Sequence, residues 1–262
     1  MFKFFSLALT YLKVGVLNEL QYRVNFFIQI LQSLIALATG LIGLALVFNH
    51  TDALGGWSRP ELLAVMGVHI LMGGVIRSAI QPNMERLMED VQEGTLDFSL
   101  TKPADAQIIV SIREFRLWQL ADFILGFIIL SVAINQIQAQ VSLLQGLGFV
   151  AALLMGGVMI YCFWLMLTST TFWIIRAYEM VNLFEGVFAA GRWPVGIYPN
   201  WLRTSLTFLV PVAFAVTVPA EALTGRLTGP TMLGAAALTV MSLLITRGVW
   251  RLGLRNYSGA SA

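Results

Sequence analysis

The chain has 262 residues, of which 58% are hydrophobic and only 11% are charged, whereas about 25% of the residues in an ordinary soluble domain are charged. This composition excludes a soluble globular fold and favours an integral membrane protein. The formal net charge of +2 provides no basic footprint for a nucleic acid, so we expect no nucleic-acid partner.

The N-terminal segment from Phe4 to Leu12 carries apolar residues near helical period, against Lys3, Ser6, Thr10 and Lys13. This pattern predicts an amphipathic helix that lies in the membrane interface. A signal peptide is the alternative, but no A-x-A-like cleavage site follows the segment.

Six apolar segments follow, and each is read as a membrane-spanning helix of roughly 20 residues. The stretch from Phe123 to Ile175 contains no Lys, Arg, Asp or Glu and is long enough to cross twice, with the polar residues from Asn135 to Ser142 as the turn. We therefore predict an all-α integral membrane protein that forms one domain over residues 1–262. The predicted spans are Val24–Phe48, Leu62–Ile80, Leu117–Ile134, Leu143–Ile175, Thr204–Val218 and Met232–Val249.

The fifth predicted span is short and contains Pro211, with Pro219 directly after it. A proline removes a backbone donor, so this span is expected to be a broken or re-entrant helix that other parts of the protein cover. Six crossings place both termini on the same side of the membrane. Of the 16 basic residues, all but Arg59 and Arg226 then lie on the side of the termini, which predicts that both termini are cytoplasmic.

The longest and most charged connection runs from Gln81 to Glu114, between the second and third spans. Its centre predicts a helix, a break at Gly94, a short amphipathic piece and a stop at Pro103. One interpretation is a cytoplasmic docking element. The other is a solvated loop whose charges only keep it in water.

The sequence has few residues that could bind a nucleotide, bind a metal or act in catalysis. None of Lys3, Lys13 and Lys102 follows a glycine, so the chain has no P-loop and is not expected to bind or hydrolyse ATP by that route. With Cys162 as the single cysteine, no disulfide can form within the chain and a metal cluster is not expected. No catalytic grouping stands out, and we expect no enzymatic activity and no cofactor.

Two ionisable residues lie inside predicted spans. His69, near the middle of the second span, either contacts a substrate or proton, or is a neutral histidine bonded to a neighbouring helix. Asp122, in the third span, either faces interfacial water or pairs with Arg116. Three glycine pairs are expected to allow close helix packing: Gly40 with Gly43, Gly73 with Gly74, and Gly156 with Gly157.

Four motifs stand out along the chain. They are E-G-T-L-D-F-S-L-T-K-P from Glu93 to Pro103, G-R-W-P-V-G-I-Y-P from Gly191 to Pro199, P-V-A-F-A-V-T-V-P-A-E from Pro211 to Glu221, and the ending W-R-L-G-L-R-N-Y-S-G-A-S-A. Together they resemble the ABC-2 (type-two) transporter permeases, in the branch of small bacterial six-span proteins encoded with a separate ATPase.

The resemblance implies a permease subunit of an exporter in the bacterial plasma (inner) membrane. Two permease chains, identical or paralogous, would assemble with two ABC ATPase subunits and move a hydrophobic or amphipathic substrate, such as a drug, lipid or peptide. A stand-alone secondary transporter or channel is the alternative, and a structural membrane subunit is a weaker one.

The resemblance also places a coupling helix, which contacts the ATPase, between the second and third spans. Its residues would be Glu89, Glu93, Gly94, Leu96, Asp97, Leu100, Lys102 and Pro103. The apolar side of this segment, formed by Leu96, Phe98 and Leu100, is expected to enter a cleft of the ATPase. Because polar groups in spans usually face protein or water, His69 and Thr207 are candidates for the translocation path.

Overall fold

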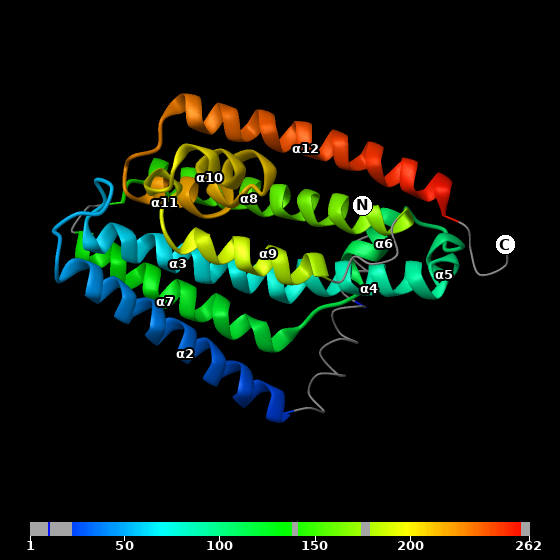
Figure 1. Ribbon diagram of the computed structural model, residues 1–262, viewed down its shortest axis with the longest axis horizontal. Coiled ribbons are helices and arrows are strands. Elements are labelled where there is room, and N and C mark those ends of the chain that lie inside the picture. Colours follow the sequence, from blue (N-terminus) through cyan, green and yellow to red (C-terminus); the bar gives the residue numbers. More distant parts are fainter. Residues whose placement is uncertain (1–9, 11–22, 138–140, 174–178, 258–262) are drawn as a thin grey trace.

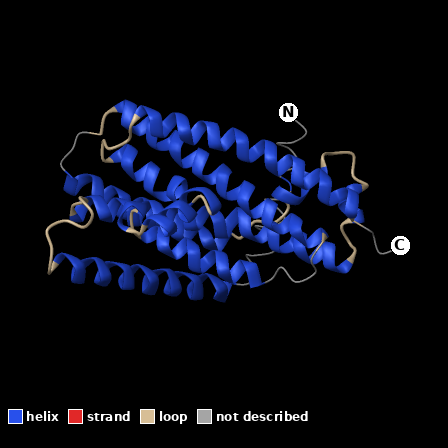
Figure 2. Cartoon of the chain, turned by 45° about the horizontal axis from the view of Figure 1, so that its top comes forward, coloured by secondary structure: helices blue, strands red, loops and turns tan. Residues whose placement is uncertain are grey.

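The computed structural model describes residue 10 and residues 23–137, 141–173 and 179–257, and over these it is helical with no β-strand. An isolated bridge joins Leu54 and Trp57. The long helices lie side by side along the longest axis (Figures 1 and 2). One end of the bundle carries the short helix α5, and we call it the α5 end. The other carries Trp57 in the turn after α2, and we call it the Trp57 end. The predicted N-terminal helix over Phe4 to Leu12 lies outside the described residues apart from Thr10.

Among the described residues, five helices are long and apolar enough to cross a membrane, and they confirm five of the six predicted spans with shifted bounds. They are α2 (Arg23–Phe48), the joined helices α3 (Arg59–Val75), η1 (Ile76–Ile80) and α4 (Gln81–Glu93), η2 (Leu117–Gln119) with α7 (Leu120–Ile137), α8 (Leu143–Ser169) with η3 (Thr170–Phe172), and α12 (Gly229–Asn256).

The second of these helices is longer than predicted. It runs for 35 residues from Arg59 to Glu93, which corresponds to about 50 Å, whereas the hydrocarbon core is about 30 Å thick. The charged residues after Ile80 ended the predicted span but do not end the helix. Its last turns therefore extend beyond the apolar layer and carry α4 to the α5 end.

The fifth predicted span, Thr204–Val218, is a bent pair of helical segments with wider bounds than predicted. Its two segments meet at an angle of 78° across Val210 to Val212. Pro211 lies in this break, so the broken helix expected from that proline is confirmed. The two segments contain α10 (Asn200–Thr204) with η6 (Ser205–Leu209), and η7 (Ala213–Thr217) with α11 (Val218–Leu223).

A further helix, α9 (Glu179–Ala189), was not predicted, and its residues were assigned to a loop. It is short and polar at several positions, but it buries Val181, Phe184 and Phe188 in the main core. Two 3-10 turns, η4 (Ala190–Arg192) and η5 (Val195–Ile197), continue from it towards the Trp57 end. There the Ile197 side chain lies against Gly55.

This path gives two basic residues, Arg192 and Arg203, positions away from the side of the termini, which corrects the prediction for both. Arg192 lines a cavity with His69, at the middle of α3. Arg203 lies within electrostatic range of Glu221 at the Trp57 end. Arg226 at the same end donates to Glu61 through Nε and Nη2, each at 2.8 Å. The charge asymmetry is therefore smaller than the sequence predicted.

Close backbone packing holds α3 to α7. A Cβ atom at Gly126 would lie 2.6 Å from the Leu71 backbone nitrogen, and one at Gly74 would lie 2.9 Å from the Phe123 nitrogen. In membranes, small residues at helix interfaces allow such packing. Of the three predicted glycine pairs, only Gly40, Gly74 and Gly156 lie against a neighbouring helix segment. Gly43 and Gly157 face open space, and Gly73 faces the side chain of Arg77.

Candidate functional site

The connection between the second and third spans is folded as three short helices. These are α4, α5 (Asp97–Leu100) and α6 (Ala106–Ile112). Gly94 follows α4 with φ 71°, a left-handed conformation that favours glycine, and its N–H donates to the Asp90 carbonyl. The predicted order of helix, glycine break and short helical piece is confirmed.

This unit has its own packed interior, so the interpretation as a solvated loop is wrong. The side chains that face inward are fully or almost fully buried, and they join the helices to one another and to the main core. Burial of apolar area is the dominant stabilising contribution. The buried residues are Met84, Leu87, Met88, Leu96, Ile109 and Val110.

Asp90 is the polar centre of the unit. Its carboxylate is buried and pairs with Arg113 at the end of α6 and with Arg86, 3.3 Å away. Thr95 Oγ1 also donates to it at 3.2 Å. Asn83 adds a second link, because its amide donates to the Glu114 carbonyl at 2.7 Å and accepts from the Glu114 N–H at 2.9 Å. The sequence does not distinguish Asp90 from the other acids of this segment.

The proposed coupling residues fall into two groups. Leu96 is 0% exposed and is part of the core, so it does not belong to the exposed apolar side expected from the sequence. Phe98 is 75% exposed, and Leu100 and Ile108 are also exposed. Glu93, Lys102 and Pro103 are exposed, whereas Glu89, Gly94 and Asp97 are partly buried.

Asp105 joins this unit to the last long helix. Its carboxylate accepts the Gln107 N–H at 2.9 Å, which caps α6, and it pairs with Arg247 of α12. The hydrogen bond from Arg247 lowers the pKa of Asp105 below its ordinary value, although partial burial opposes this shift. The unit is thus held to both α4 and α12.

We expect Asp105→Asn to lower the thermal midpoint of the purified protein at neutral pH. The folded-state pKa is below the unfolded one, so the contribution of Asp105 is present above the unfolded pKa and is lost as the pH falls through the folded value. Because the pair is partly exposed, the loss at neutral pH should be at most about 1 kcal/mol. Thermal unfolding against pH tests this, with Asp52→Asn as the control, and a difference that persists in strong acid would contradict it.

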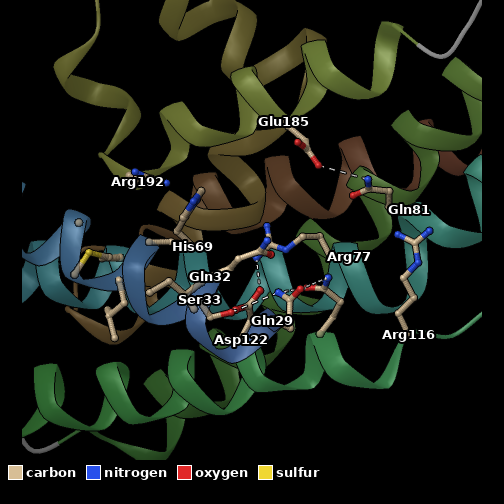
Figure 3. A pocket seen from close by; sticks show the side chains of 16 residues that line it. Gln29, Gln32, Ser33, His69, Arg77, Gln81, Arg116, Asp122, Glu185 and Arg192 are labelled. Atoms are coloured by element: carbon tan, nitrogen blue, oxygen red, sulfur yellow. Dashed lines mark hydrogen bonds and ion pairs between the residues drawn. The ribbon is translucent and has the colours of Figure 1, made fainter. Parts of the chain in front are cut away.

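A second feature is a polar cavity of about 380 Å³ between α2, α3, α7 and α9 (Figure 3). At its centre, Arg77 donates to Asp122 at 2.5 Å, and Ser33 of α2 donates to the other oxygen of the same carboxylate. Asp122 is only 4% exposed. The predicted pairing of Asp122 with Arg116 is wrong, because Arg116 instead pairs with Glu85 at 2.7 Å.

The ion pair lies at a special point of its helix. Arg77 belongs to η1, a single π-helical turn between α3 and α4. Such turns interrupt α-helices and are frequent at functional sites. Nearby, Gln29 of α2 and Gln119 exchange amide hydrogen bonds of 3.0 and 3.1 Å. These contacts connect the sparsely packed α2 to the rest of the bundle.

His69 lines the same cavity and is 9% exposed. Its ring stacks on Phe188 of α9 with centroids 4.5 Å apart, and its Nδ1 atom has no hydrogen-bond partner among the residues that the structure describes. Thr207, the other predicted residue of the path, is not a lining residue. Its hydroxyl donates to the Arg203 carbonyl within its own helical segment at 2.7 Å. The structure therefore does not bring His69 and Thr207 together in this cavity.

Two cavity residues were missed because α9 was not predicted. Glu185 on α9 accepts a hydrogen bond from Gln81 at 3.5 Å. Arg192 in η4 lies near His69 (Figure 3). A helical pattern that places Val181, Phe184 and Phe188 on one face was the available signal for α9.

Long apolar helices, a bent helix pair and an internal polar cavity define a multi-pass membrane protein with an interior site. The chain belongs to the ABC-2 family of transporter proteins, whose family model matches residues 34–261. The comparison with curated proteins and the comparison with solved structures gave no match. The family resemblance inferred from the four motifs is thus confirmed.

Proposed function

We propose that this chain is the permease subunit of an ATP-driven exporter in a bacterial plasma membrane, formed as one domain and without ATPase activity of its own. Two permease chains, identical or paralogous, work with two ATPase subunits. The α4–α6 unit docks on the ATPase, and the cavity around Arg77 and Asp122 belongs to the substrate path. Family membership supports the transporter class.

The observation that carries the proposal is the position of the α4–α6 unit. Exposed Phe98 and Leu100 lie on a unit that Asp90 and Asn83 hold rigid. The same continuous helix that ends in this unit also carries His69 and Arg77 at the cavity. A movement of the docked unit can therefore reach the cavity along one helix.

We expect Phe98→Ala to weaken ATPase association by roughly 10- to 30-fold, because truncation of a buried apolar anchor costs about 1.4 to 2 kcal/mol. Leu100→Ala should act in the same direction, and Lys102→Ala should act less, since rim charges mainly steer association. Pull-down of the co-expressed ATPase from the same membranes is the measurement, alongside transport.

Phe127→Ala is the matched control, because Phe127 is an exposed phenylalanine of α7 outside the unit. Leu96→Ala separates docking from folding, since Leu96 is in the core and its loss should lower thermal stability. ATPase retention by both Phe98→Ala and Leu100→Ala at the level of the parent would refute the docking role.

The proposal places the α5 end in the cytoplasm. Cysteine at Asp52, at the Trp57 end, should react with a membrane-impermeant maleimide in intact cells, whereas cysteine at Thr101 should react only after permeabilisation. The native chain provides the background control, because Cys162 is buried. Labelling of Thr101→Cys in intact cells would show that the α5 end lies outside the cell and would contradict the proposed orientation.

A further inference from the structure

Arg192 lies where three cavities meet. It lines the polar cavity of about 380 Å³, a second cavity of about 150 Å³ and a third of about 260 Å³. A guanidinium can only donate hydrogen bonds and stays charged. Arg192 is exposed and has no hydrogen bond or ion pair with the described part of the chain, and Figure 3 shows it at the edge of the polar cavity beside His69.

His69 provides a second polar group beside Arg192, and its Nδ1 atom faces Gly191, the residue before Arg192. Its side chain is more than nine-tenths buried and lines both the polar cavity and the third cavity with Arg192. Nδ1 is buried and has no partner within the described residues. Buried polar groups are normally hydrogen-bonded, and an exception calls for an explanation such as a missing ligand.

The ion pairs around the polar cavity leave Arg192 as the cationic group that can accept an anion. Three arginines and two carboxylates line the described part of the cavity, and Glu85 beside it provides a third carboxylate. Asp122 neutralises Arg77, and Glu85 neutralises Arg116. Glu185 has only the long contact with Gln81. Arg192 is the lining arginine that no described carboxylate pairs, and it lies beside the unpartnered histidine.

The second cavity adds an apolar wall. Beyond Arg192, towards the Trp57 end, it is lined mainly by Leu44, Leu62, Met66 and Trp193. A ligand whose charged group binds Arg192 can therefore bury an apolar part in this second cavity. Aliphatic carbon buried there gains from its removal from water.

We propose that this site binds the anionic group, a phosphate or carboxylate, of an amphiphile. Arg192 and His69 bind the anion, and the apolar part lies against Leu62 and Trp193. The proposal rests on the proposed exporter function and specifies the chemistry of its substrate. It assigns roles to Arg192 and Trp193, which the sequence alone did not identify.

The test uses the permease alone in nanodiscs and follows quenching of Trp193 fluorescence by brominated chains. The probes share one chain and differ in charge: ω-bromododecanoate, ω-bromododecyl phosphate and ω-bromododecylammonium. We expect at least one anion to quench at a concentration at least tenfold below that of the ammonium compound. Trp193→Phe should remove that quenching, which identifies the reporting residue among the 7 tryptophans.

Arg192→Gln should weaken anion binding by roughly 10- to 100-fold, as expected for a lost charge-assisted hydrogen bond. Arg192→Lys should retain part of the affinity, which separates lost charge from lost folding. Arg251→Gln, an exposed arginine of α12, should have no effect. Inorganic phosphate at the same concentrations should not displace the amphiphile; full displacement would show that a free anion is the ligand and overturn the proposal.

Stronger quenching by the ammonium compound, lost in Glu185→Gln, would show a cation site instead. Anion quenching that Arg192→Gln leaves unchanged would also overturn the proposal. Neither result depends on the ATPase. If the anion does not bind but the ATPase is still pulled down, only the substrate assignment is rejected. If the ATPase does not dock but the anion still binds, the exporter assignment is rejected.

Discussion

Asp122→Asn should strongly destabilise the protein, because it leaves Arg77 without its ion pair inside the bundle. Removal of one partner from a buried pair costs about 3 to 5 kcal/mol, and we expect the lower end of this range because the Arg77 side chain is 36% exposed to the cavity. Ser33 also loses its charged acceptor. Thermal unfolding in detergent, followed by size-exclusion chromatography, measures the effect.

A double-mutant cycle provides the control. Arg77→Gln combined with Asp122→Asn removes both charges, so it should destabilise less than the two single changes added together. Glu85→Gln breaks the more exposed pair with Arg116 and should cost about 1 kcal/mol or less. Additive effects of the two changes at Arg77 and Asp122 would show that their ion pair does not contribute to stability.

Gly126→Leu should prevent stable folding of the bundle. The first added carbon would lie 2.6 Å from the Leu71 nitrogen and 2.8 Å from the Leu71 Cα, so the obstruction is backbone that no rotamer change can relieve. Overpacking in a core commonly costs about 1 to 3 kcal/mol. Because the Leu71 backbone cannot move aside, we expect Gly126→Leu to cost at least the upper value of this range. Gly126→Ala should already lower the thermal midpoint.

Gly157→Leu is the matched control, because a Cβ atom at Gly157 would meet nothing within 4 Å in the described part of the chain. It should give a yield of monodisperse protein close to that of the parent, measured by fluorescence-detected chromatography of a fusion. A Gly126→Leu protein with the parental thermal midpoint would contradict the close packing of α3 against α7.

Long uninterrupted apolar segments were the part of the fold that the sequence predicted well. α2 and α8 begin within one residue of the predicted Val24 and Leu143, because a span in lipid must satisfy its backbone internally. The break at Pro211 and the turn at Gly94 were predicted for a related reason, since each residue has a backbone restriction or freedom that others lack.

The contacts of the cavity could not be predicted in the same way. Arg77 and Asp122 are separated by 45 positions, so no helical spacing joins them, whereas Arg116 lies close to Asp122 in sequence and was the wrong choice. α9 was missed because its two acidic residues and short length resemble a loop. Arg192 was consequently assigned to the membrane surface and not to the cavity.

The π-helical turn at Ile76–Ile80 fixes the rotational phase of everything that follows it in the same helix. It closes with a hydrogen bond from the Gln81 N–H to the Ile76 carbonyl, and thus holds one residue more than an α-helical turn. Each residue of an α-helix turns the chain by about 100°. Without the extra residue, Met84 and Leu87 would rotate out of the core by that angle while α3 stayed in place. The length of this one turn is therefore a constraint on insertions and deletions within the helix from Arg59 to Glu93.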